Sequence, residues 1–115
     1  MLSPERIERL RRYLLEQQDS LRRQILSLDM SSQEPSVVIG NHMADDATAA
    51  FDQATAVSLR RNHEAMLNEV ERALARMAAG TYGICERCHN PIDFARLKAK
   101  PHATLCMTCQ RVAEL

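Results

Sequence analysis

Two pairs of cysteines near the C-terminus constrain this chain more than any other feature of its sequence. Two residues separate the cysteines within each pair, and 17 residues separate the pairs. Zn²⁺ prefers four thiolate or imidazole ligands in a tetrahedron, and a CxxC turn presents two sulfurs to one side of a metal. The spacing therefore predicts one structural zinc ion, held by the chain's four cysteines, which are Cys85, Cys88, Cys106 and Cys109.

Other readings of the cysteines are weaker. Two redox-active CxxC motifs of the thioredoxin kind would need a βαβ context, which the sequence lacks. A catalytic zinc keeps one coordination position open, and four thiolates leave none. His89 and His102 lie near the pairs, but we expect them at the surface rather than in the ligand set.

Hydrophobic residues that repeat every seven positions predict a long amphipathic helix over about residues 4–29. Ser3 suits the N-cap and Pro4 the first turn of such a helix. Arg and Glu occupy its other faces. The apolar stripe consists of Ile7, Leu10, Leu14, Leu21, Ile25 and Leu28.

A second long helix is predicted from about Asp45 to Ala79, and Gly80 is a plausible C-terminal stop. The stretch between the helices, about residues 30–45, contains Pro35 and Gly40 and reads as a loop. We expect His63 to be a partly buried packing residue rather than a ligand. The expected seam of the second helix consists of Leu59, Met66 and Ala73, with His63, Val70 and Met77 beside them.

Two long helices joined by one connection are expected to form an antiparallel coiled coil. The predicted fold is mostly α, with a helical hairpin over residues 1–79 and a four-cysteine zinc-finger domain over residues 80–115 that ends in a short helix. Aromatic residues make up only 3% of the chain and Trp is absent, which suits a thin rod better than a large globular core. The connection would lie at one end of the rod and the finger at the other.

Charge is distributed unevenly between these two ends, although the chain carries 15 basic and 15 acidic residues. No Lys or Arg occurs from Gln24 to Leu59, while the acids there are Asp29, Glu34, Asp45, Asp46 and Asp52. This window could be a solvated turn with acids at a helix start, or a tip for a cationic or metal-containing partner site. The finger has no strong basic footprint, so direct DNA binding is not expected.

No run of 18 apolar residues occurs, so no membrane span is expected. The N-terminal residues are charged and amphipathic and lack the apolar stretch of a signal peptide. We therefore expect a cytoplasmic protein.

The segments GTYGICERC and RLKAKPHATLCMTCQ resemble the DksA/TraR family of bacterial four-cysteine zinc-finger transcription regulators. The similarity covers about residues 80–110, and NHMADDATAA resembles the family's tip segment more loosely. It implies a coiled coil with a globular zinc end, no enzymatic activity, and direct binding to RNA polymerase rather than to DNA. In this family the coiled coil enters the secondary channel of the polymerase, and its acidic tip modulates transcription initiation.

The resemblance also implies roles for single residues. The family's tip pattern, Asp-x-x-Asp-x-Ala, falls on His42, Asp45 and Ala47, so the first acid is replaced, and Asp46 is a further acid beside it. Some members respond to the alarmone ppGpp through basic residues, which Arg96 and Lys100 could match. Glu69 stands where another basic residue would be expected, which argues against a strong ppGpp response.

Two function classes remain open from the sequence. One is a polymerase-binding transcription regulator. The other is a zinc-finger coiled-coil adaptor, or a chaperone-like protein, that binds a different protein partner. Catalysis is a weak third reading, because no paired carboxylates face a histidine and no Gly-rich phosphate loop is present. Oligomeric state is not fixed by the pattern.

Overall fold

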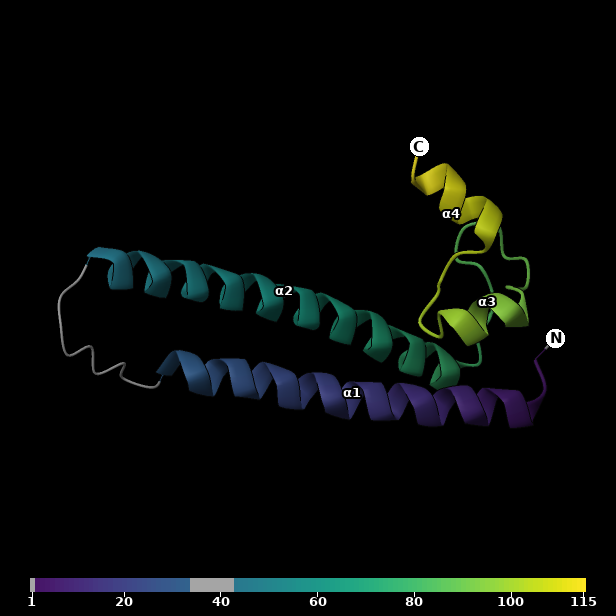
Figure 1. Cartoon of the computed structure of the whole chain (residues 1–115). Coiled ribbons are helices and arrows are strands. Elements are labelled where there is room, and N and C mark those ends of the chain that lie inside the picture. Colours follow the sequence, from purple (N-terminus) through teal and green to yellow (C-terminus); the bar gives the residue numbers. More distant parts are fainter. Residues whose placement is uncertain (1, 34–42) are drawn as a thin grey trace.

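The described part of the chain is a helical rod with a small folded unit at one end. The structure is a computed structural model that describes residues 2–33 and 43–115, with side chains described for 2–29 and 49–115. Two long helices, α1 (Pro4–Gln33) and α2 (Met43–Ala79), run antiparallel, and two short helices, α3 (Phe94–Ala99) and α4 (Met107–Ala113), follow (Figure 1). The molecule measures 62 × 32 × 20 Å.

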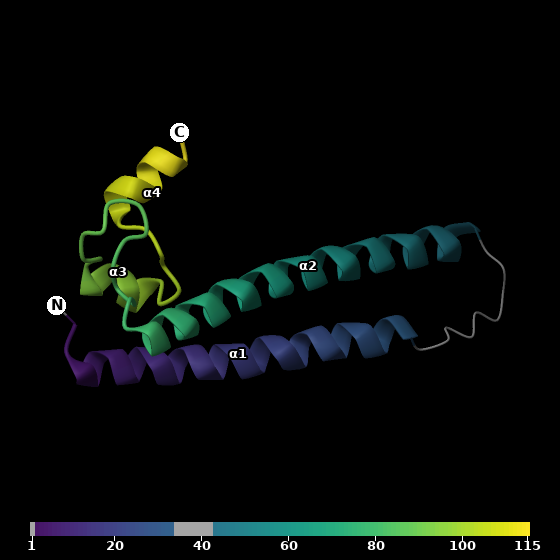
Figure 2. The ribbon, with the colours of Figure 1, turned by 180° about the vertical axis from the view of Figure 1, so that it is seen from behind.

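The two ends of the rod are structurally different. The C-terminal end of α1 and the N-terminal end of α2 lie together at one end, which we call the far end (Figures 1 and 2). The N-terminal end of α1 and the C-terminal end of α2 lie at the other end beside residues 80–115. We call this end the base. The predicted mostly α fold is confirmed, and the finger lies at the opposite end of the rod from the C-terminal end of α1 and the N-terminal end of α2.

The predicted stripe of α1 faces α2. Leu10, Leu14 and Leu21 are buried, and the remaining members of the stripe are half-buried. The predicted cap is also present, because the backbone N–H of Arg6 donates to the Ser3 hydroxyl oxygen at 3.3 Å. The helix runs four residues past the predicted end at residue 29.

The predicted seam of α2 is partly wrong. Val70 and Ala73 are buried and His63 and Met77 are half-buried, but Leu59 and Met66 are 43% and 46% exposed. The residues of α2 that contact α1 are spaced by alternating steps of three and four residues, as in a coiled coil. This line of contact lies beside Leu59 and Met66 on the helix surface and leaves both side chains exposed. The side chains that form the observed line are Ala56, His63, Leu67, Val70, Leu74 and Met77.

The C-terminus of α2 is capped by backbone hydrogen bonds that depend on glycine. Gly80 has φ +78°, its N–H donates to the Met77 carbonyl, and the Thr81 N–H donates to the Arg76 carbonyl. These two bonds form a Schellman motif, in which a left-handed residue just past the helix satisfies the last free carbonyls. The motif turns the chain from α2 into the finger, as the sequence predicted for Gly80.

Burial is concentrated at the base. Side chains of α1, α2 and the finger form one hydrophobic cluster there, whereas no side chain in residues 49–69 of α2 is buried. Ion pairs between the helices extend further along the rod: Arg22 lies 3.2 Å from Glu71, and Arg60 pairs with Asp29. In the described residues, no helix combines the length and apolar character that a membrane span requires.

Candidate metal centre and rod tip

The first cysteine pair lies in a tight backbone turn. Ile84 and Pro91 form an isolated antiparallel bridge, and the Cys85 N–H donates to the Asn90 carbonyl at 2.9 Å. Within the turn, the His89 N–H donates to the Cys85 carbonyl at 3.0 Å, and His89 adopts φ +61°. A left-handed residue directly after the second cysteine lets the chain fold back, so that both sulfurs face the same side.

The second cysteine pair lies at the start of α4. Cys106 precedes the helix, and Cys109 is buried in its first turn. The Glu86 N–H donates to the Thr104 carbonyl at 2.9 Å, which holds the segment before α4 against the first cysteine turn. The sequence suggested only a short hairpin between the pairs and missed α3, although the run ARLKA is rich in helix-forming residues.

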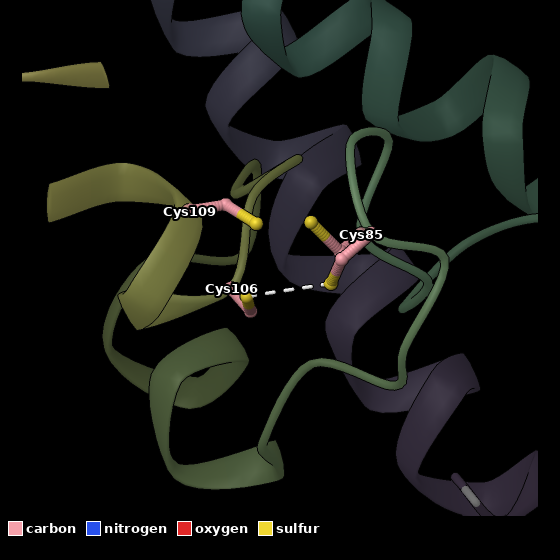
Figure 3. Close-up of side chains that lie close together, drawn as sticks. Cys85, Cys106 and Cys109 are labelled. Carbon is pink, nitrogen blue, oxygen red and sulfur yellow. Dashed lines mark hydrogen bonds between the residues drawn. The ribbon is translucent and has the colours of Figure 1, made fainter. Parts of the chain in front are cut away.

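The four sulfur atoms converge at one point. All four Sγ atoms lie within 4.8 Å of one another, and those of Cys88 and Cys106 are 3.7 Å apart. Figure 3 shows the sulfurs of Cys85 and of the α4 pair directed toward a common centre. Tetrahedral zinc with Zn–S bonds of about 2.3 Å requires sulfurs roughly 3.8 Å apart, so the cluster fits a four-thiolate zinc ion.

The pKa values of the two buried thiols, Cys85 and Cys109, are shifted in opposite directions. Burial alone would raise the pKa of Cys85, but backbone hydrogen bonds from Cys88, Cys106 and Arg87 lower it to about 5. The pKa of Cys109 is raised to about 12 by burial and by the neighbouring sulfurs. Four thiolates this close together repel one another, and a divalent cation supplies the charge that keeps all four ionised.

Buried side chains between α2 and α4 support the cysteine turns. Leu97 of α3 is fully buried, and the buried Tyr82 hydroxyl donates to the Pro101 carbonyl at 2.8 Å. Burial raises the pKa of Tyr82 to about 12, so it remains a donor near neutral pH. A Cβ on Gly83, which has φ +83°, would lie 2.8 Å from Leu2 of the N-terminal segment. The Gly-x-Tyr-Gly lead-in thus allows α1 and the finger to pack closely.

A clamp of charged side chains joins the finger to α2. The Glu86 carboxylate accepts a hydrogen bond from Arg72 at 2.9 Å, and Nη1 of Arg76 lies 2.8 Å away, paired by charge but not aligned for a hydrogen bond. Arg76 also donates to the carbonyls of Thr81 and Ile84. Sequence reasoning missed this clamp, because the four-residue spacing of the two arginines places them on one face of α2 but does not identify Glu86 as their partner.

The predicted surface histidines differ from each other. His89 is exposed, as expected. His102 is half-buried, and its Nε2 lies 3.1 Å from Glu69 of α2. Burial lowers the pKa of His102, with Lys100 acting in the same direction and Glu69 opposing it. His102 therefore links the finger to the rod.

Arg96 and Lys100 have different surroundings. The half-buried Arg96 donates to the Leu105 carbonyl at 2.8 Å and lies 2.9 Å from the Met107 sulfur, so its guanidinium braces the loop before α4. Lys100 is exposed and lines a polar cleft of about 170 Å³ together with Glu69 and His102. Arg96 is absent from the lining of that cleft.

The predicted tip residues are only partly covered by the structure. His42 lies outside the described residues, while Asp45, Asp46 and Ala47 fall in the first turns of α2, where side chains are not described. Their positions on the backbone place them at the far end of the rod, opposite the cysteine cluster (Figure 1).

A long antiparallel helical hairpin with a four-cysteine zinc finger at its base defines the class of this protein. The model of the prokaryotic dksA/traR C4-type zinc finger matches residues 80–115. General stress protein 16O of Bacillus subtilis is 34% identical over 116 residues, which cover 98% of this chain and 71% of that protein. The chain belongs to the DksA/TraR family.

Other relatives extend the comparison. The RNA polymerase-binding transcription factor DksA of Caulobacter vibrioides is 36% identical over 72 residues, covering 61% of this chain and 51% of that protein. The chain thus spans about half the length of this DksA relative. Transcription factor DksA2 of Pseudomonas aeruginosa superposes with a TM-score of 0.83 at 26% identity, covering 97% of this chain and 85% of that one. The predicted family is confirmed, as is a C4 zinc finger whose cysteines are placed to hold one metal ion.

Proposed function

We propose that this protein binds RNA polymerase and regulates transcription initiation by inserting the far end of its rod into the secondary channel. The proposal rests on the named polymerase-binding relatives and on one feature of this chain: an acidic end carried on a thin rod, opposite the zinc finger. A helical hairpin two helices wide can enter a channel that excludes a globular domain. In this role the zinc ion fixes the base, and the chain performs no catalysis of its own.

Asp45 and Ala47 are the proposed tip residues, with His42 and Asp46 as companions. Asp45 is the acid that keeps the family pattern, and a small Ala47 lets the tip approach the polymerase backbone closely. The binding surface would lie along the rod and the finger. Its partners are proteins: a net charge of zero and the absence of Lys and Arg from residues 24–59 oppose duplex DNA binding, which rests on phosphate neutralisation.

This role places the protein in the cytoplasm. We expect at most a weak response to ppGpp, because Glu69 contributes a negative charge to the cleft that contains Lys100. The adaptor alternative is less favoured, since the relatives whose names state a partner are polymerase-binding factors.

Asp45→Ala tests the proposal. In transcription reactions with purified polymerase, the variant should lose its effect on initiation while keeping its helicity and its polymerase affinity. Asp45 is the third residue of α2, and an acid in the first turn of a helix stabilises it by only about 0.3–1 kcal/mol, so unfolding does not explain a loss of activity. Asp19→Ala, an exposed acid in the middle of α1, is the matched control. Regulation by Asp45→Ala equal to that of the unmodified protein would reject the tip, and failure of the unmodified protein to bind polymerase would reject the partner.

A further inference from the structure

A basic and aromatic groove lies between the start of α1 and the finger. The groove is open to solvent and has a volume of about 340 Å³, and the Arg6 guanidinium lies 4.3 Å from the centroid of the Phe94 ring at its edge. None of the lining residues is acidic. We call this cavity the base groove, and its main lining residues are Arg6, Arg9, Tyr13, Phe94, Lys98 and Pro101.

The cations of the base groove have no acidic partner within the described part of the chain. Other arginines of α1 pair with carboxylates, such as Arg11 and Arg12 with Glu8. None of the ion pairs found among the described residues involves Arg6, Arg9 or Lys98. Tyr13 is 47% exposed beside them. The groove therefore presents positive charge and an aromatic surface to a ligand that would carry the opposite charge.

The complementary surface lies on α2 toward the far end of the rod. Phe51 is 71% exposed and is followed by the exposed Asp52. Leu59 lies eight residues after Phe51, and Met66 lies seven residues after Leu59, so at 3.6 residues per turn both fall on the same side of α2 as Phe51. Phe51, Asp52 and Leu59 lie in the part of α2 before Arg60, where the described residues include no Lys or Arg, and Asp52 is the exposed acid of this surface; Met66 lies beyond Arg60 and Arg61.

One molecule cannot join these two surfaces, because they lie near opposite ends of a rod whose long dimension is 62 Å (Figures 1 and 2). We propose that two copies of the chain associate side by side in opposite directions, with Phe51 and Asp52 of each copy at the base groove of the other. A two-fold axis across the rods makes the two contacts identical and closes the assembly. The inference does not depend on the proposed function.

A protein surface fits the base groove better than a small anion does. Arg6, Arg9 and Lys98 are all exposed, so they form a charged rim rather than the enclosed polar pocket that holds a small ligand. Charged rims steer encounters and select partners, and exposed apolar side chains such as Phe51 and Tyr13 provide the contact area. The association is therefore expected to be weak and sensitive to salt.

Sedimentation velocity of the zinc-loaded full chain is the first measurement. The average mass should rise from monomer toward dimer between low micromolar and millimolar concentration at low ionic strength. It should return to monomer near 1 M salt, where the screening length falls to about 3 Å. A monomer at every concentration at low salt would refute the proposal, and so would a dimer that persists unchanged at high salt.

A charge exchange locates the contact. Variant A carries Asp52→Lys, and variant B carries Arg9→Glu with Lys98→Glu; all three positions are exposed, so the fold is retained. Each variant alone places like charges at both contacts and should lose self-association at least tenfold. Mixed in equal amounts, A and B place opposite charges at both contacts and should form a one-to-one dimer.

The control is Arg61→Glu with Arg111→Glu, which changes the charge as much as variant B does but at exposed positions outside the base groove. It should self-associate within about twofold of the unmodified chain. If the mixture of A and B stays monomeric while the unmodified chain dimerises, the contact lies elsewhere and the proposal is wrong. If variant B alone dimerises as well as the control does, the base groove is not occupied and the proposal is likewise wrong.

Discussion

At the base of the rod, α1, α2 and the finger all contribute buried side chains, whereas toward the far end only α1 and α2 face each other. Leu14 and Leu97 are fully buried at the base, where the finger packs against both helices. In the distal part of α2, by contrast, even apolar side chains such as Phe51 remain largely exposed. Burial at the base therefore provides most of the folding stability, and residues toward the far end can contact other molecules because they are not needed in a core.

This difference explains which expectations from the sequence were correct. The base is specified by strong local signals: two CxxC pairs, the glycine that ends α2, and a heptad stripe whose members point to one partner. The seam of α2 carries apolar residues on more than one line, and Leu59 and Met66 could have been buried had α1 packed slightly further round. The way α1 packs against α2 determines that the residues in line with His63 and Val70 are the ones that become buried.

The link between the finger and the rod could not be predicted either. Glu86 lies 14 residues from Arg72 along the chain, and the turn at Gly80 decides whether the two meet. Charges are common in both segments, so composition does not select the pair. Long-range contacts between exposed charges depend on backbone geometry that no local pattern encodes.

Removing one zinc ligand should produce the largest effect and confine it to the base. Structural zinc contributes folding free energy on the order of 10 kcal/mol in small modules, because the ligands have no fixed geometry without it. Cys106→Ser should lower the zinc content well below one ion per chain and melt residues 80–115 while much of the helicity of α1 and α2 remains. Elemental analysis and circular dichroism measure the two effects.

Thr108→Ser, an exposed change within the same cysteine pair, is the control and should keep its zinc. Full zinc occupancy in Cys106→Ser would contradict the four-cysteine site. Collapse of the entire helical signal would show that the rod depends on the finger more than the burial pattern indicates.

Truncating a leucine should have a smaller effect that depends on its position along the rod. Leu14 is fully buried at the base, and Leu14→Ala should lower the free energy of unfolding by about 2–5 kcal/mol through lost burial and a residual cavity. Leu26 lies on the same helix toward the far end and is 60% exposed, so Leu26→Ala should cost within about 0.5 kcal/mol. Urea unfolding of the zinc-loaded chains gives both values, and equal costs would remove the contrast between the two regions.

The smallest predicted effect concerns pH and the second link between finger and rod. Burial lowers the pKa of His102, so the folded chain binds a proton there less readily than the unfolded chain does. The unfolded state then holds more protons as the pH falls through the ordinary histidine range near 6.5, and stability present above that range is lost below it. His102 is faced by Glu69 and Arg72 of α2, by Lys100, and by Gln110 of α4. Because Glu69 opposes the effect of burial, the loss of unfolding free energy as the pH falls from about 7.5 to 5.5 should be small.

Two substitutions should change the dependence of the unfolding free energy on pH in opposite directions. His102→Gln removes the titrating group and should flatten the dependence of unfolding free energy on pH. Glu69→Gln removes the only carboxylate paired with His102 among the described residues, which lowers the histidine pKa further and should steepen the dependence. Protonation of the zinc ligands destabilises all three proteins at low pH in the same way, so the differences among them isolate His102. If both substitutions shift the pH profile in the same direction, the link acts through packing rather than through the charge on the imidazole.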